Sequence, residues 1–131
     1  MKKGKRIAAI VLTIVMVTVT NVCVKANSSE HGALGDYTVY AQSHISTYSA
    51  YGTTYSSLYN PDILAEVTYA EYICIKPYTT NTTTLTGSSW GYSTTTKTFS
   101  APDGYRSSSI ACDHKASLGS GTWTNHTNAA Y

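Results

Sequence analysis

The chain has 131 residues, of which 11% are aromatic and only 12% are charged, and its formal net charge is +2. Five of the nine basic residues precede Asn27, so the remainder keeps four basic against seven acidic residues, a net charge of −3. This balance argues against nucleic-acid binding through a basic patch and against electrostatic docking on anionic membranes, because both need an excess of Lys and Arg.

The first 26 residues have the pattern of a secretory signal peptide. A basic start precedes an apolar run over residues 7–20, and Val24-Lys25-Ala26 places small residues before a cleavage site. The lysine-rich start is typical of a bacterial protein. We therefore expect cleavage near Ala26, a secreted or cell-surface protein, and membrane contact only through this leader. A retained membrane anchor is one alternative, because residues 7–24 approach the length that spans a membrane. Lipidation at Cys23 is another alternative.

The next residues predict a flexible segment followed by one domain. Residues 27–36 are polar and contain two glycines, whereas residues 37–131 carry the alternating patterns of a single β domain. The first alternation starts at Tyr37 and predicts an extended segment to about Tyr55. Tyrosines also stand at helical spacing over Tyr48–Tyr59, but the Ser, Thr and Gly between them are poor helix formers. We favour a strand there, with a helix as the alternative.

The most apolar stretch follows, over residues 63–76. Both of its faces are largely apolar, which predicts a central strand that ends at Pro77. The Thr-, Ser- and Gly-rich residues 78–91 indicate a long hairpin connection.

The remaining strands are separated by turn signals. Proline presets φ and glycine accepts positive φ in the turn at residues 101–104, and a second turn falls at residues 119–121. The strands expected around them cover residues 93–100, 105–117 and 122–124, before a polar tail. About five strands predict an all-β fold, a small antiparallel sandwich or barrel-like domain.

Two cysteines, Cys74 and Cys112, remain after cleavage at Ala26. Both lie on apolar strand faces, and the oxidising exterior of the cell permits a disulfide between them. A bond requires Cα atoms about 4.4–6.8 Å apart. The alternative is a pair of buried thiols that pack as small hydrophobic side chains.

The sequence offers little catalytic or metal-binding chemistry. The histidines after the leader are scattered without HExxH spacing, and the cysteines lack a zinc pattern. Few acids are available for a glycosidase pair. We therefore expect no catalytic residues, no metal and no cofactor. A small secreted hydrolase remains the least favoured alternative.

Binding fits the composition better. Tyr and Trp supply broad, rigid contact area, and Ser and Thr supply adaptable hydrogen bonds. An aromatic platform is expected from five side chains, namely Tyr40, His44, Tyr48, Trp90 and Trp123. The alternative is that aromatic residues form the core, because Leu, Ile and Val are scarce. We expect a non-enzymatic factor that binds a glycan, such as cell-wall glycan, or another surface protein.

Several short segments carry a resemblance to known proteins. They are the Lys-rich leader and the segments 100–105 (SAPDGY), 114–116 (HKA) and 121–124 (GTWT). With these segments the chain resembles small secreted proteins of Gram-positive bacteria, a resemblance that implies no activity. It is more loosely similar to lactococcin-972-type bacteriocins, which are small, exported, Tyr/Ser-rich β-proteins. That likeness implies an antimicrobial protein as the alternative function.

Overall fold

Alternating buried and exposed side chains build eight strands in residues 27–131, the part of the chain that this computed structural model describes. The leader predicted over residues 1–26 lies outside the described residues. The strands are β1 (Asn27–Leu34), β2 (Tyr37–Ile45), β3 (Ser49–Ser56), β4 (Leu64–Ile75), β5 (Thr82–Tyr92), β6 (Thr94–Ser100), β7 (Arg106–Leu118) and β8 (Gly121–Ala130).

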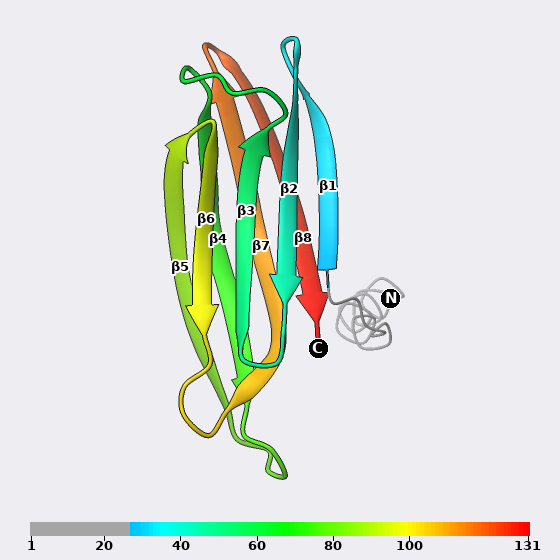
Figure 1. Cartoon of the computed structure of the whole chain (residues 1–131), viewed down its shortest axis with the longest axis vertical. Coiled ribbons are helices and arrows are strands. Elements are labelled where there is room, and N and C mark those ends of the chain that lie inside the picture. The colour runs from blue at the N-terminus through cyan, green and yellow to red at the C-terminus, as the bar shows by residue number, and fades with distance from the viewer. Residues whose placement is uncertain (1–26) are drawn as a thin grey trace, which may run out of the picture.

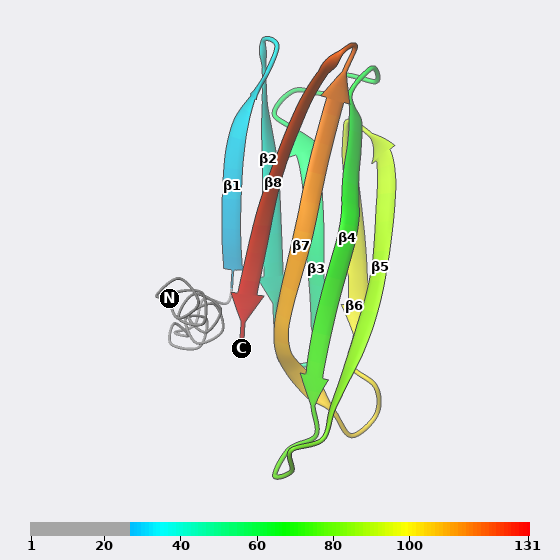
Figure 2. The ribbon, with the colours of Figure 1, turned by 180° about the vertical axis from the view of Figure 1, so that it is seen from behind.

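The strands form two antiparallel sheets that lie face to face (Figures 1 and 2). Sheet A has the order β1-β2-β3-β6, and sheet B has the order β5-β4-β7-β8. The all-β prediction is confirmed, but the number of strands is eight rather than about five. No helix in the described part of the chain is long and apolar enough to cross a membrane.

The segment expected to be flexible, residues 27–36, instead begins with β1. Its eight residues pair with β2 along their full length, from Asn27 opposite His44 to Leu34 opposite Tyr37. The hairpin closes at Gly35, where φ is +66°, a conformation that glycine adopts without strain. Backbone pairing therefore orders a polar edge strand in which Leu34 alone is a buried hydrophobic residue.

Two other polar segments are also strands. The expected connection at residues 78–91 contains most of β5, and the expected polar tail continues the short last strand into the ten-residue β8. In β5 the side chains alternate between exposed and half-buried, and Thr and Ser occupy both faces. A strand built in this way lacks the apolar alternation by which strands are recognised in a sequence.

The extended segment predicted from Tyr37 to about Tyr55 is two strands joined by a turn. β2 ends at Ile45 and β3 begins at Ser49, where the backbone N–H of Ser46 donates to the Ser49 carbonyl at 2.8 Å. Tyr48 lies in this turn and is 66% exposed. The helical alternative is wrong, because residues 49–56 are a strand that pairs with both β2 and β6.

The core between the sheets contains a few large side chains among many small ones. One cluster packs around Tyr72, Phe99 and Ile110, and a second packs around Val39 and Ile63. Gly52 of sheet A faces Cys112 of sheet B so closely that a Cβ at position 52 would lie 2.4 Å from the Cys112 Sγ. The absence of a side chain at Gly52 therefore allows the sheets to approach.

A chain of polar side chains crosses this core. His114 of β7, only 1% exposed, has Nδ1 2.8 Å from Thr54 Oγ1 and Nε2 2.8 Å from Thr127 Oγ1. The Thr54 hydroxyl donates to the Glu66 carbonyl at 2.9 Å, and Ser43 Oγ is hydrogen-bonded to Thr127 Oγ1. The chain thus joins side chains of β2 and β3 in sheet A to side chains of β7 and β8 in sheet B.

The donors in this chain assign the state of the imidazole. Because the Thr54 proton is committed to a carbonyl, Thr54 Oγ1 accepts from Nδ1–H, and Nε2 then accepts from the Thr127 hydroxyl. The pKa of His114 is lowered to about 4, mainly by burial and also by nearby His126, while Asp113 opposes both. His114 is therefore neutral near pH 7.

The two cysteines are both buried but do not bond to each other. Cys112 of β7 pairs with Ala70 of β4, and Cys74 lies four residues farther along β4. At a rise of about 3.3 Å per residue their Cα atoms are about 13 Å apart, which is beyond disulfide reach. Of the two alternatives that the sequence left open, the structure contains the pair of buried thiols, because strand register keeps the cysteines apart even though both face the core.

Acid should destabilise the fold through His114. Its pKa is lower folded than unfolded, where the usual value is 6.5, so the unfolded chain takes up the proton first. The stabilisation is complete above about pH 6.5 and is lost as the pH falls toward 4, by about 3 kcal/mol. Urea unfolding at pH 7.5, 5.5 and 4 should show this loss in the wild type and a smaller one in His114→Gln. Parallel pH profiles for the two proteins would contradict the assignment.

The thiols should be free and unreactive in the folded protein. Burial raises the pKa of both Cys74 and Cys112, and the thiolate is the reactive form. Without reductant, Ellman titration should detect no thiol in native buffer and two thiols in denaturant. A protein that yields two thiols in denaturant only after reduction would contain the disulfide that this register excludes.

The contact between Gly52 and Cys112 predicts coupled substitutions. Gly52→Ala should lower the free energy of unfolding by about 1–3 kcal/mol, because a methyl group meets the sulfur atom across the core. The Cys112→Ala background removes that sulfur, so the cost of Gly52→Ala should be smaller there. Urea unfolding of the two single variants and the double variant measures the coupling. Additive costs would show that the two residues do not limit the approach of the sheets.

Candidate functional site

The outer face of sheet A arranges its side chains in three rows across the strands. Cross-strand partners lie on the same face of a sheet, and alternate residues of each strand share that face. The register therefore defines a surface, here called the aromatic face, made of the rows Asn27-His44-Tyr51-Thr98, Ser29-Gln42-Thr53-Thr96 and His31-Tyr40-Tyr55-Thr94.

Two of the rows contain stacked rings. In one row the rings of His44 and Tyr51 are stacked at 5.1 Å between centroids, with 23° between their planes. In another row Tyr40 stacks on Tyr55 at 5.1 Å and 16°, and His31 lies tilted against Tyr40 at 5.9 Å. In each stack, the β2 ring covers one face of the tyrosine on β3. The other face of that tyrosine is on the side of the short threonine side chains of β6.

The row between the two ring stacks consists of polar side chains that rise less far from the sheet than the rings do. Thr53 is only 9% exposed, and its hydroxyl is bonded to the Thr95 carbonyl at 2.8 Å and to Thr96 Oγ1 at 2.9 Å. Gln42 Nε2 makes one long hydrogen bond of 3.4 Å to the Tyr55 hydroxyl. The two ring stacks are four residues apart along β2, which is about 13 Å. The polar row therefore forms the floor of a trough between two aromatic walls.

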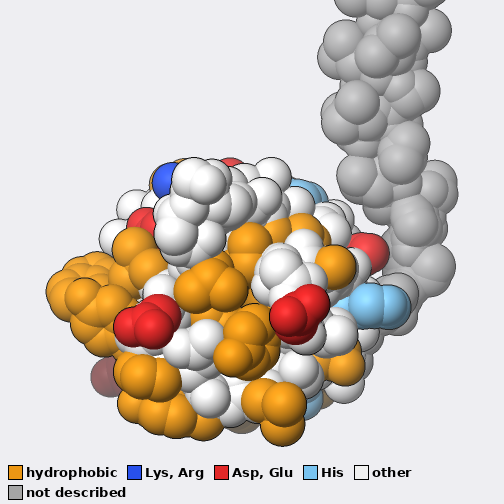
Figure 3. All heavy atoms as spheres, turned by 90° about the horizontal axis from the view of Figure 1, so that it is seen from above, with side chains coloured by type: hydrophobic (Ala, Val, Ile, Leu, Met, Phe, Trp, Pro, Cys, Tyr) orange, Lys and Arg blue, Asp and Glu red, His pale blue; other side chains and the backbone are white. Residues whose placement is uncertain are grey.

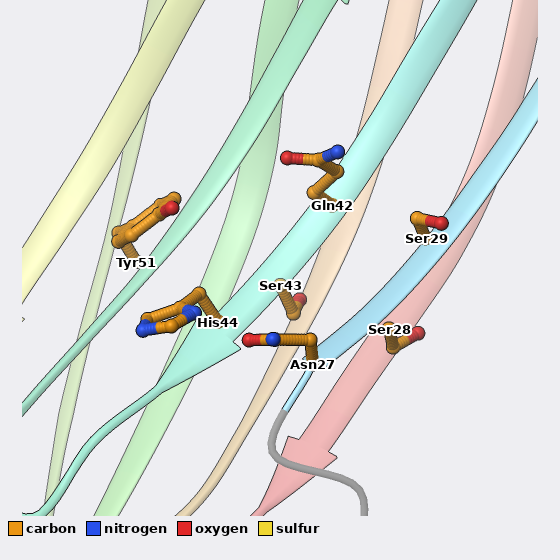
Figure 4. Close-up of a pocket in the computed structure, with 7 residues that line it drawn as sticks. All are labelled: Asn27, Ser28, Ser29, Gln42, Ser43, His44 and Tyr51. Carbon is orange, nitrogen blue, oxygen red and sulfur yellow. The ribbon is translucent and has the colours of Figure 1, made fainter.

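A shallow hollow opens at the β1 side of this trough. It has a volume of about 230 Å³ and is lined by Asn27, Ser28, Ser29, Gln42, Ser43, His44 and Tyr51. Figure 4 shows the His44 and Tyr51 rings side by side, with the side-chain amides of Asn27 and Gln42 on the same face of the sheet. The hollow thus combines ring surface with uncharged donors and acceptors.

The aromatic face has no formal charge from carboxylates, ammonium groups or guanidinium groups. None of its twelve residues is Asp, Glu, Lys or Arg. A ligand matched to this surface is neutral, has apolar faces for the rings and has several hydroxyl or amide groups for the polar row.

The structure brings together only part of the predicted platform. Tyr40 and His44 lie on the aromatic face, and Tyr48 is exposed in the turn that follows β2. Trp90 lies on the outer face of sheet B, opposite Glu66. Trp123 packs at the β1–β8 edge, where a Cβ at Gly32 would lie 2.1 Å from its indole Nε1. Trp123 is therefore half-buried against the second core cluster.

Sequence reasoning missed Tyr51 and Tyr55 as members of this face. Alternation through residues 37–55 as one strand places Tyr51 and Tyr55 on the face opposite to Tyr40. The turn after Ile45 reverses that parity, so that His44 pairs with Tyr51 and Tyr40 pairs with Tyr55. A turn predicted at residues 46–48 would have brought the four rings to one face.

Metal chemistry has no obvious location in the described residues. Within residues 27–131 no three or more His, Cys, Asp or Glu side chains are grouped so as to hold a metal ion. The one ion pair found there joins Asp113 Oδ1 and His126 Nδ1 at 2.7 Å, with both side chains about half exposed on sheet B.

Comparison with protein-family models, curated proteins and solved structures finds no match for this chain.

Proposed function

We propose that this protein is a secreted, non-enzymatic β domain that binds a neutral glycan chain across the aromatic face of sheet A. The observation that carries the proposal is the pair of ring stacks on either side of an uncharged hydrogen-bonding row. A pyranose ring has the same two characters, an apolar C–H face and a rim of hydroxyl groups.

The geometry favours a chain of sugars over a single sugar. The free faces of Tyr51 and Tyr55 both look toward β6 and are separated by about 13 Å, four residues of an antiparallel strand. The polar side chains of Gln42 and Ser29 lie between the two stacks. An extended oligosaccharide that contacts both stacks would pass over this polar row and exchange hydrogen bonds with it.

The same surface favours binding over cleavage. Glycosidases use a pair of carboxyl groups, and the aromatic face contains no Asp or Glu. The absence of charge also gives no attraction for a polyanion, in keeping with a net charge of −3 from Asn27 onward.

Removal of one ring stack should weaken glycan binding. Tyr51→Ala deletes the partner of His44, and we expect the retention of the folded protein on insoluble neutral glycans to fall by about tenfold, which corresponds to about 1.4 kcal/mol. Pull-down with purified chitin, cellulose and insoluble β-1,3-glucan measures the bound fraction. Fold integrity is checked by far-UV circular dichroism.

The matched control is Tyr78→Ala. Tyr78 is fully exposed in the loop between β4 and β5, remote in sequence from the aromatic face, so this variant should bind as the wild type does. Wild-type protein that is retained on none of the three materials would refute the proposal. Equal losses in the two variants would also refute it, because adhesion would then follow from tyrosine content rather than from the face.

A further inference from the structure

The outer face of sheet B carries a second row that spans all four strands. Its members are Trp90 of β5, Glu66 of β4, Lys115 of β7 and Thr124 of β8, each opposite the next in the register. We propose that this face is a second glycan site, so that one molecule bridges two glycan chains. The bridging rests on the proposed function of the aromatic face, whereas the second site itself does not.

Trp90 provides an open aromatic surface. Its side chain is 66% exposed, and it meets Tyr92 edge to face, with 5.8 Å between centroids and 85° between planes. In this arrangement Tyr92 covers at most one face of the indole. The other face is free to receive the C–H face of a sugar ring, and Leu64 lies opposite Tyr92 as further apolar contact.

Charged groups beside the indole are free to bond to hydroxyls. Glu66 lies between Trp90 and Lys115 in the row and is half-buried, as is Lys115. Among the described residues neither side chain forms a salt bridge within 4.0 Å. The Glu66 carboxylate can accept from sugar hydroxyls and the Lys115 ammonium can donate to them, and such charge-assisted hydrogen bonds are the stronger ones.

A hollow continues the row toward β8. It has a volume of about 480 Å³ and is lined by Thr68, Asp113, His114, Lys115, Thr124, Asn125 and His126. Asp113 Oδ1 and His126 Nδ1 are 2.7 Å apart at its edge. The register of β4 shifts between Val67 and Ala70, and both Thr68 and Tyr69 are exposed on this side. A β-bulge changes the direction of side chains in this way.

The charges of this face select the same ligand class as the aromatic face. Glu66 lies opposite Lys115 on the neighbouring strand, and Asp113 lies two residues from Lys115 along β7. Hydroxyl groups satisfy charges of both signs, whereas a polyanion would meet two carboxylates for one ammonium group. A neutral, hydroxyl-rich glycan therefore fits both faces.

The two sites lie on opposite sides of the molecule. Sheets A and B are stacked with their inner faces together (Figures 1 and 2), about 10 Å apart. Side chains on the two outer faces therefore point in opposite directions. One glycan chain cannot contact both sites across the core, so occupation of both requires two chains.

An apolar end of the sandwich adjoins the Trp90 face. Hydrophobic side chains gather there among carboxylates (Figure 3), and Leu58 and Tyr59 of the β3–β4 loop are 69% and 76% exposed. A protein partner on this end is the competing use of Trp90. Leu58→Ala tests it, because that residue contributes to the apolar end and not to the row of sheet B.

Stoichiometry and cross-linking separate the possibilities. With soluble chitohexaose and cellohexaose, isothermal titration should give two sites on the wild type, one on Trp90→Ala, one on Tyr51→Ala and none on the double variant. Beads coated with the bound hexasaccharide should be agglutinated by the wild type and by Leu58→Ala, and by neither single ring variant. Glu66→Gln should weaken the Trp90-dependent site by about fivefold.

The failures are distinguishable. One site on the wild type that survives Trp90→Ala and is lost in Tyr51→Ala overturns the second site and leaves the proposed function standing. One site that is lost in Trp90→Ala and survives Tyr51→Ala overturns the proposed function and the bridging. Agglutination that Leu58→Ala abolishes, or that occurs with uncoated beads, assigns Trp90 to an apolar contact and overturns the second glycan site. Binding to neither hexasaccharide overturns both proposals.

Discussion

The hydrogen-bond chain through His114 fixes how the two sheets meet. Its side chains come from β2, β3, β7 and β8, each ring nitrogen of His114 bonds to one hydroxyl, and the hydroxyls of Thr54 and Thr127 each take part in two hydrogen bonds. Leaving any of these buried polar groups unpaired would cost about 1–3 kcal/mol. A shift of one residue in β7 would turn His114 to the outer face and leave the hydroxyls of Thr54 and Thr127 without it. A core poor in Leu, Ile and Val thus acquires its register from polar pairing.

The same chain lies directly beneath the proposed glycan surface. Ser43 stands between Gln42 and His44 in β2, and Thr54 stands between Thr53 and Tyr55 in β3. Successive residues of a strand point to opposite faces, so a buried anchor holds the backbone between each pair of outward side chains. The ring stacks and the polar row are therefore placed by the interior and do not depend on loop conformation.

The sequence predicted those parts of the fold in which apolar alternation is strong, and missed those in which polar residues occupy both faces. The central strand at residues 63–76 coincides closely with β4, whereas β1, β5 and β8 are rich in Ser, Thr, Asn and Gly. Such residues form strands here because a neighbouring strand supplies backbone partners, and pairing of distant segments leaves no local pattern. The sequence left the disulfide between Cys74 and Cys112 open for the same reason, since inward faces are visible in the sequence and register is not.

The expected platform was placed in part for a related reason. Tyr40 and His44 follow from alternation within one strand, but their ring partners Tyr55 and Tyr51 follow only from the turn between β2 and β3. The sequence grouped Trp90 with them because aromatic composition does not tell which sheet a residue belongs to. In the structure Trp90 lies on sheet B and faces the opposite side of the molecule. Separate sheets convert one aromatic-rich sequence into two outward surfaces, one uncharged and one carrying Glu66 and Lys115. In the two-site binding that we propose, this separation of the sheets sets the number of binding sites.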